Sequence, residues 1–447
     1  MQREKGMRPR SKQLKAAQRL PPFILRKNAL SPLGYIQKSI SVYSRLYLRA
    51  GIEHFFSQVC VDFHLLKGVS FMLDPRYKKL AQTLVHHSCR VEPGDNVLVE
   101  AAEIPTSMLT VLAEEICQAG GVPIFNIQNQ SIMRQLLLDP DPEKVKARCQ
   151  AIGALELERM KHVQCYISMR GMTNAAALAD TPPQNVEIYQ KYWQKPVHLE
   201  QRVKHTRWVV MRWPNPAMAQ LALMSTEAFE DYFFEVCLAN YQAMEIAVQP
   251  LKERLLRTDK VRLTGPGTDL RFSIKDIGAV PDFGRRNIPD GECYSAPHKH
   301  SVEGTIAFNT PTNFRGVRMD NIRLTFHEGK VVEASSSDTE NLNRILDIDE
   351  GARYIGEFSL GFNPFVDKPI GDTLFDEKIR GSLHLALGNC YDAANNGNKS
   401  SIHWDLVLCQ EPGGDVYFDD QLIRHNGIFV DDELKGLNPD ELKKSLA

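Results

Sequence analysis

A histidine and an aspartate stand two residues apart within the mostly apolar segment 401–406, Ser-Ile-His-Trp-Asp-Leu. Side chains at positions i and i+2 of a strand leave the same face, so a strand here would aim His403 and Asp405 at one point. Trp404 and Leu406 would then face the opposite, packed layer. An imidazole and a carboxylate can ligate a metal together, although a buried His-Asp pair is also commonly just a satisfied hydrogen bond. The pair predicts a strand, and further ligands are needed before it indicates a metal site.

Four more residues with ligand side chains lie in apolar or glycine-rich segments of the last third of the chain. They are Glu292, Glu357, Glu377 and His384. With the first pair they make four carboxylates and two imidazoles, and unpaired charges in such surroundings are costly. A shared divalent cation is the economical explanation. This donor set suits zinc, cobalt or manganese better than calcium, and the absence of paired cysteines argues against a structural zinc site.

Each of these residues also has a structural interpretation. Glu292 follows a Pro-Asp-Gly turn and could be a surface glutamate at the entrance to a strand, while Glu357 could face solvent from a strand. We expect a helix over residues 383–391, which would turn His384 and Tyr391, seven residues apart, toward the same cavity. A core tyrosine with a satisfied hydroxyl group is the alternative for Tyr391.

Other motifs favour structure over chemistry. The Gly-Pro-Gly-Thr-Asp run at 265–269 lacks the Lys-Ser/Thr of a phosphate loop and predicts a hairpin turn. His298 and His300 have metal-like spacing but fall in a polar loop, where solvated residues are expected; their proximity to Glu292 leaves a substrate contact open. Cys293 and Cys390 lie beside the candidate ligands without the motif of a cysteine hydrolase, so we interpret them as packing residues.

The first half of the chain must supply a layer that supports these residues. Helices are expected over residues 75–87 and 107–119, and strands within 91–102, 120–127, 162–171 and 205–214. This alternation predicts a parallel α/β layer. Residues 225–255 are expected to form one long amphipathic helix, with Pro250 as the point where it could break.

The second half is rich in strand signals. Strands are expected within 261–274, 304–314, 321–335 and 415–430, with a helix over 338–348. The predicted fold class is α/β with two domains: an amino-terminal α/β domain over residues 72–255, and a carboxy-terminal mixed α/β domain over 256–447 that carries the metal site.

Composition limits the class of partner. The chain has 447 residues, 43% of them hydrophobic, and a formal net charge of -1. Residues 1–71 hold 13 Lys and Arg against 3 Asp and Glu, so the remainder carries a net charge of -11, which argues against nucleic acid as a partner. No apolar run approaches the length that spans a bilayer, so no membrane association is expected. Nine scattered cysteines without a C-x-x-C pair favour a reduced cytoplasm.

The basic segment 1–71 differs in composition from the rest of the chain. Its excess of Lys and Arg could indicate a transit peptide with an amphipathic helix. We instead interpret it as upstream translation or a disordered extension, because residues 67–69, Lys-Gly-Val, would be encoded by a purine-rich sequence like a bacterial ribosome-binding site shortly before Met72. The natural chain is therefore expected to begin at Met72.

Several ordered segments resemble the thermophilic metalloaminopeptidase family typified by aminopeptidase T, aminopeptidase S and PepS. They are NIPDGECYSAP, SVEGTIAFN, EGARYIGEFSLG, DTLFDEKIRGSLHLALG and KSSIHWDLV, with MLDPRYKKLAQTLVHHSCRVEPGDNVLVEA at the start. The resemblance extends from Met72 onward and implies a smaller amino-terminal α/β domain, a metal-bearing carboxy-terminal domain and a homodimer that encloses the active sites.

The resemblance also implies roles for individual residues. Two divalent ions would be held by Glu292, Glu357, Glu377, His384, His403 and Asp405. Glu357 would be the bridge between the ions, and Tyr391 would lie near them to hydrogen-bond a reaction intermediate. The implied reaction is removal of amino-terminal residues from peptides with a free amino terminus.

Paired ions make this chemistry possible because they generate hydroxide near neutral pH and polarise the scissile carbonyl. A carboxylate must then pass the proton to the leaving amine, and Glu357 or a free oxygen of Glu292 could do so. A dinuclear phosphoesterase is the first rival and would need a cluster of cations, for which Arg285, Arg286 and Arg380 are few. A non-catalytic peptide-binding module is the second, and it would be expected to have lost ligands.

Overall fold

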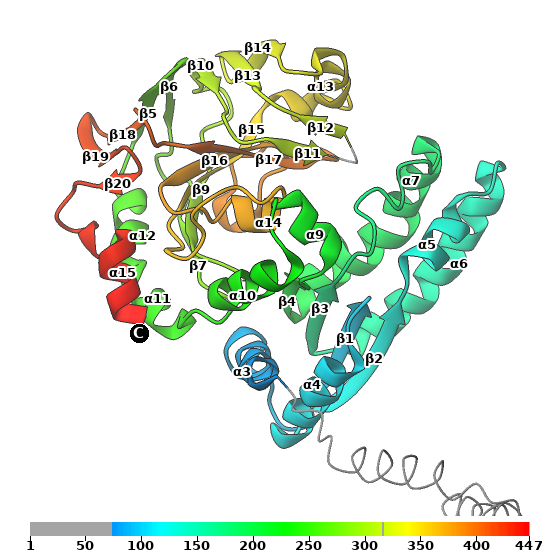
Figure 1. Cartoon of the computed structure of the whole chain (residues 1–447). Coiled ribbons are helices and arrows are strands. Elements are labelled where there is room, and N and C mark those ends of the chain that lie inside the picture. The colour runs from blue at the N-terminus through cyan, green and yellow to red at the C-terminus, as the bar shows by residue number, and fades with distance from the viewer. Residues whose placement is uncertain (1–73, 315–316, 447) are drawn as a thin grey trace, which may run out of the picture. The chain divides into compact units, whose positions relative to one another are not determined.

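The structure is a computed structural model that describes residues 74–314 and 317–446. These described residues all belong to one compact unit. The interpretation of residues 1–71 lies outside the described residues. Figure 1 labels the helices and strands.

The first sheet is parallel, as the alternation of elements predicts. Its strand order is β2-β1-β3-β4-β8, with every pairing parallel. The strands are β1 Asn96–Ala102, β2 Val122–Gln128, β3 Cys165–Arg170, β4 Arg207–Arg212 and β8 Asn287–Ile288. The helices before and between them are α3 Pro75–Gln82, η2 Thr83–Ser88, α4 Thr106–Gln118, α5 Gln130–Leu137, α6 Pro142–Lys161, α7 Pro183–Tyr189, η3 Gln190–Arg202, α8 Val203–His205 and α9 Pro216–Leu221.

Strand β8 joins this sheet although it comes from the second half of the chain. The parallel sheet therefore receives a strand from beyond residue 255. The division into domains 72–255 and 256–447 stays a prediction.

The prediction of one long helix over residues 225–255 is wrong. Three helices occupy this stretch: α10 Thr226–Cys237, α11 Tyr241–Ala247 and α12 Gln249–Leu256. The first break falls at Asn240, whose side chain accepts a hydrogen bond from the backbone N–H of Ala243 and so caps α11. The break expected near Pro250 is confirmed, because α11 ends at Ala247 and Pro250 occupies the first turn of α12, where its missing N–H costs nothing.

The second half forms three further sheets among the described residues, as its strand-rich sequence predicts, and the smallest is the two-stranded sheet of β11 and β12. An eight-stranded antiparallel sheet has the order β14-β13-β10-β6-β5-β18-β19-β20, and a five-stranded sheet has the order β17-β16-β15-β9-β7. The strands are β5 Lys260–Gly265, β6 Thr268–Ser273, β7 Val280–Asp282, β9 Glu292–Ser295, β10 Glu303–Ala307, β11 Thr312–Phe314, β12 Val317–Met319, β13 Arg323–His327, β14 Lys330–Ser335, β15 Ile355–Gly361, β16 Ser382–Gly388, β17 His403–Cys409, β18 Asp415–Phe418, β19 Gln421–His425 and β20 Ile428–Phe429. The helices are α13 Thr339–Leu346, η4 Glu350–Arg353, α14 Thr373–Asp376, η5 Asp392–Ala394, η6 Lys435–Leu437 and α15 Pro439–Leu446.

The Gly-Pro-Gly run is the hairpin turn that the sequence predicts, because it joins the antiparallel pair β5 and β6. The helix predicted over residues 383–391 is wrong. Ser382–Gly388 is instead strand β16, buried at every position and paired with both β15 and β17. A central strand is packed on both faces, so its sequence is apolar throughout and cannot be told from a buried helix by periodicity.

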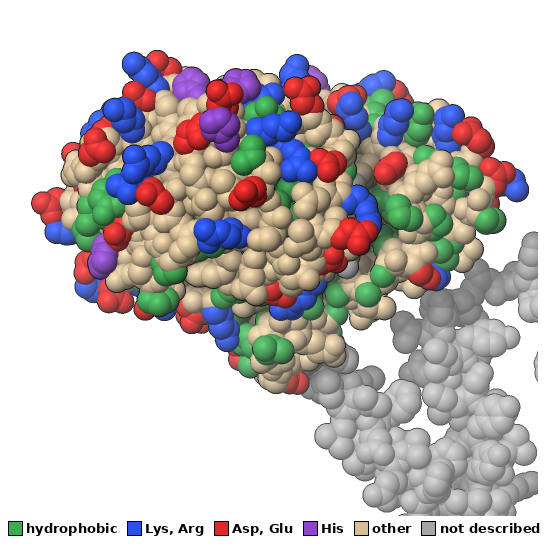
Figure 2. Space-filling view, turned by 90° about the horizontal axis from the view of Figure 1, so that it is seen from above, with side chains coloured by type: hydrophobic (Ala, Val, Ile, Leu, Met, Phe, Trp, Pro, Cys, Tyr) green, Lys and Arg blue, Asp and Glu red, His purple; other side chains and the backbone are tan. Residues whose placement is uncertain are grey.

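The surface on the face shown in Figure 2 carries Lys and Arg side chains interspersed with Asp and Glu. No helix in the described part of the chain is long and apolar enough to cross a membrane.

Gly388 closes β16 at a point where only a glycine fits. Its φ is +103°, and an added Cβ would lie 2.2 Å from the backbone oxygen of Ile402. We expect Gly388→Ala to lower the free energy of unfolding by at least about 2 kcal/mol, from left-handed strain plus the backbone clash. Gly397→Ala is the control, since its φ is +80° with nothing within 4 Å. Urea denaturation compares the two, and equal losses would contradict the close-approach argument.

Candidate metal centre

Four adjacent strands of the five-stranded sheet bring the predicted ligands together. Glu292 begins β9, Glu357 lies in β15, His384 in β16, and both His403 and Asp405 in β17. The register places Glu292 opposite Gly361 and His384 opposite both Ser359 and Val407. Glu377 comes from outside the sheet, at the carboxyl end of α14.

The strand predicted within residues 401–406 is confirmed as β17, His403–Cys409, and its two faces differ as expected. Trp404 is buried, with its ring stacked on Phe314 at 4.9 Å and its Nε1 donating to Oγ1 of Thr312 at 3.1 Å. His403 and Asp405 meet on the other face, with Nε2 and Oδ1 3.3 Å apart.

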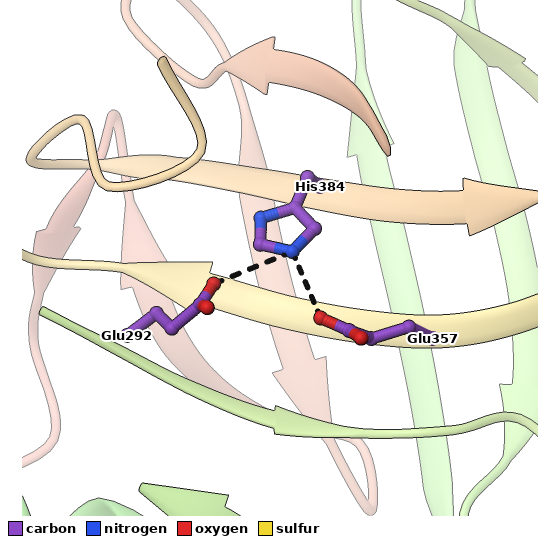
Figure 3. A group of neighbouring side chains, drawn as sticks. All are labelled: Glu292, Glu357 and His384. Carbon is purple, nitrogen blue, oxygen red and sulfur yellow. Dashed lines mark hydrogen bonds and ion pairs between the residues drawn. The ribbon is translucent and has the colours of Figure 1, made fainter. Parts of the chain in front are cut away.

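His384 lies between two carboxylates, as Figure 3 shows. Its Nε2 is 3.3 Å from Oε2 of Glu292 and 3.0 Å from Oε1 of Glu357. The second oxygen of Glu357 faces the other imidazole, 3.6 Å from Nε2 of His403. Glu357 therefore presents one oxygen to each histidine.

Three sets of donor atoms in the described residues are close enough to surround a cation, and two of them consist entirely of predicted ligands; the third, Asp282-Asp290-Glu292, contains carboxylates alone. In each of the sets Glu292-Glu357-His384 and Glu377-His384-Asp405, the ligand atoms lie within 4.8 Å of one another. These are nitrogen and carboxylate oxygen donors, the types that zinc, cobalt and manganese accept.

Two further observations test whether a divalent ion fits here. Oε2 of Glu357 is buried and has no hydrogen-bond partner among the described residues. Burying an unpaired carboxylate oxygen costs free energy, which a bound cation would offset. Nδ1 of His403 lies 2.8 Å from the backbone oxygen of Asn389. Donation from Nδ1 would leave the Nε2 lone pair free for a metal. The cluster fits a divalent ion, and the role of each residue as a ligand stays a prediction.

The surrounding charges act strongly on the imidazoles. Burial lowers the pKa of His384, but Glu292 and Glu357 outweigh it and raise the pKa to about 9. Burial is likewise outweighed at His403, chiefly by Asp405, and its pKa rises to about 10. Burial would raise the pKa of Asp405, yet the two histidines hold it far below its ordinary value. A metal binds the neutral imidazole, so a divalent ion and these protons compete for the same lone pairs.

The sequence analysis missed Lys378, which is fully buried beside the cluster. Its ammonium pairs with Glu292, lies 2.8 Å from Oε1 of Glu377 and 3.5 Å from Oδ1 of Asp290. Burial would lower its pKa, but Glu292, Glu377 and Asp290 hold it well above its ordinary value. The sequence offered one signal, a lysine directly after the candidate ligand Glu377. Because lysine is almost always exposed, this signal did not predict a buried ammonium beside the cluster.

Ser359 was also missed. Its Oγ donates to Oε2 of Glu292 at 2.9 Å. Both oxygens of Glu292 are therefore engaged, one by Ser359 and the other by Lys378.

Tyr391 reaches the cluster by a different route from the predicted helix. It follows β16 in a loop, is 45% exposed, and its ring lies 4.7 Å from the ring of His403. A tyrosine at the exposed edge of the cluster can meet a bound substrate with its hydroxyl group.

The other candidates lie where their structural interpretations place them. Cys293 is buried on β9, and Cys390 donates to the backbone oxygen of Asn398. The ring of His298 contacts the backbone oxygen of Lys275 at 2.7 Å from a loop.

The chain is similar to known proteins over most of its length. The model of the family described as thermophilic metalloprotease (M29) matches residues 73–415. Aminopeptidase T from Thermus thermophilus is 26% identical over 75% of this chain and 92% of its own length. Aminopeptidase 2 from Geobacillus stearothermophilus is 24% identical over 74% of this chain and 91% of its own. The structure of wild-type AmpT from Thermus thermophilus has a TM-score of 0.68 and 24% identity, covering 80% of this chain and 99% of that one, which shows a shared fold.

Proposed function

Since the chain belongs to the thermophilic metalloprotease family (M29) and is a metal-dependent aminopeptidase, we propose that it cleaves peptides at the buried cluster of carboxylates and imidazoles. The proposed ligands are Glu292, Glu357, Glu377, His384, His403 and Asp405. The observation that carries this assignment is the pair of contacts from the two oxygens of Glu357 to the two histidines.

We assign two positions for divalent ions, with Glu357 shared between them. Glu292, His384 and Glu377 would complete one position, and His403 and Asp405 the other. Bound zinc, cobalt or manganese would supply an activated water and polarise the scissile carbonyl.

The residues of the chain itself would handle the proton and the substrate. Glu357 and Glu292 both remain candidates for proton transfer. Both oxygens of Glu292 accept hydrogen bonds, and both oxygens of a shared Glu357 would be engaged by the ions. Tyr391, at the exposed edge, would donate its hydroxyl proton in a hydrogen bond to the carbonyl under attack.

Three finer features are part of the same proposal. The substrates are peptides with a free amino terminus, the protein is a homodimer, and it works in the cytoplasm. The eight cysteines in the described residues are all free thiols, which agrees with a reducing compartment. Light scattering would report the mass of the particle, and cell fractionation its compartment.

The rival functions have less support. A phosphoesterase would use free cations near the ions, whereas Arg285 binds Glu245 through two contacts of 3.0 Å. Arg286 lies over the ring of Trp208. A non-catalytic module would be expected to lack ligands, yet all six residues are present and lie together.

Removal of metal is the direct test of this function. We expect a chelator to abolish hydrolysis of short peptides and amino-acid amides, and zinc, cobalt or manganese to restore it. Acetylation of the peptide amine should block cleavage, because the nitrogen of an acetylated amine is a poor metal ligand. Release of free amino acids and elemental analysis of the protein measure both effects. Equal turnover of free and acetylated peptides would contradict the aminopeptidase assignment, and full activity of the metal-free protein would contradict the metal requirement.

A further inference from the structure

Lys378 places a permanent positive charge against one side of the proposed metal centre. Its side chain has no exposed surface, and its ion pairs are with Asp290, Glu292 and Glu377. An isolated ammonium in such a place would be very unfavourable, so the three carboxylates hold it there.

These contacts are distributed unequally over the candidate ligands. Oε1 of Glu292 and Oε1 of Glu377 are directed at the ammonium. Oε2 of Glu292 is directed at His384, 3.3 Å away. His403 is paired instead with Glu357 and Asp405. Lys378 therefore contacts ligands of the proposed metal position formed by Glu292, His384 and Glu377. It does not contact His403 or Asp405, which form the other proposed position.

Asp290 shows that the ammonium is part of the architecture. Its Oδ2 accepts the backbone N–H of Gly284 at 2.7 Å, and its Oδ1 that of Gly291 at 3.0 Å. Asp290 is thereby held in place beside Lys378 and is fully buried. Any displacement of the ammonium would break its contact with this fixed carboxylate.

We propose that Lys378 makes the two metal positions unequal, so that the ion held by Glu292, Glu377 and His384 binds more weakly than the ion held by His403 and Asp405. This inference rests on the proposed function. Lys378 is a positioning residue: it leaves Glu292 and Glu377 with one oxygen each for the metal, and its charge repels the ion that those oxygens receive.

The sign of the effect follows from counting charge. Metal affinity at oxygen-rich sites rises with the number of carboxylates that are free to bind, and a neighbouring cation opposes a dication over several ångströms in a buried setting. Removing the ammonium takes away the one ion-pair partner that Asp290 and Glu377 have among the described residues, and leaves Glu292 with His384 alone. The affinity of the weaker position should therefore rise when the charge is removed.

The test is a zinc titration of the metal-free full chain against a competing chelator. Wild type is expected to bind two zinc ions with dissociation constants that differ by at least about tenfold, given the strength of charge interactions at buried sites. Lys378→Met should lower the larger of the two dissociation constants by at least about tenfold and leave the smaller one nearly unchanged. Lys378→Arg keeps the charge and should preserve the inequality. Lys368→Met, at an exposed lysine ten residues earlier, is the matched control and should change neither constant.

Two further arms keep the test decisive. If Lys378→Met does not fold, Lys378→Gln, which keeps a hydrogen-bond donor without the charge, replaces it with the same expectation. In Asp405→Asn, the zinc ion that remains should show the weaker of the two constants. A wild-type protein with two equal constants, or a neutral Lys378 variant whose weaker constant stays the same or weakens, overturns the inference while leaving the proposed function intact. A protein that binds no zinc, cobalt or manganese would overturn the proposed function itself.

Discussion

Asp405→Asn is expected to lower turnover at least a hundredfold and to remove one metal ion from the protein. Loss of a partner that merely supports a ligand costs roughly ten- to a hundredfold in affinity or activity, so loss of a charged ligand should cost at least about as much. The substitution keeps the shape and volume of the side chain but removes the charge beside Nε2 of His403, 3.3 Å away. Elemental analysis after dialysis and peptide hydrolysis measure the two effects on one sample.

Trp404→Ala is the matched control from the opposite face of β17. Trp404 is 2% exposed and stacks on Phe314, so its removal should lower the free energy of unfolding by about 3 to 5 kcal/mol. Under conditions where it is folded, this variant should keep its metal. Two results are required together. The Asp405 variant must fold but lack its full metal content, and the Trp404 variant must be less stable but retain its metal. Full metal content and activity in Asp405→Asn would refute both the strand-face argument and the assigned ligand set.

Local periodicity was enough to predict β17 and the shared face of its two proposed ligands, His403 and Asp405. The strand alternates buried and partly exposed residues from His403 to Leu406, and a period of two residues is visible in the sequence. The parallel layer was predictable for a similar reason, because helix and strand signals alternate along the first half of the chain.

Periodicity failed where a strand is buried on both faces or a helix is interrupted by its caps. Ser382–Gly388 has no polar face, so nothing in that segment separates a central strand from a buried helix. At residues 238–240 the amphipathic pattern continues across a break that a single capping side chain produces.

Ser359 and Lys378 could not be predicted as parts of the site, because their roles depend on contacts between segments that lie far apart in the sequence. Ser359 and Lys378 both act on Glu292, from 67 and 86 residues away. The pairing of β15 with β9 brings Ser359 to Glu292, and the register of a sheet is not encoded in any one of its strands. Lys378 reaches Glu292 from the turn that follows α14. A buried lysine is rare enough that composition alone argues against it.

Glu357→Gln is expected to have a broader effect on metal content than Asp405→Asn. If Glu357 serves both positions, the substitution takes charge from both, and zinc content should fall toward zero after dialysis, with turnover lowered by more than about a hundredfold. The amide retains the size of the side chain and one acceptor oxygen, so the fold should survive. Glu333→Gln, the same change at an exposed strand position, is the control.

The geometry explains why the two variants should differ. Oε1 of Glu357 lies 3.0 Å from His384, and Oε2 lies 3.6 Å from His403, whereas the 3.3 Å contact of Asp405 with His403 is shorter than its 4.0 Å approach to His384. Zinc retained per chain should therefore rank wild type, then Asp405→Asn, then Glu357→Gln. If Glu357→Gln keeps one tightly bound ion, Glu357 is not shared between two ions, and the two positions would have to be assigned without a bridging carboxylate.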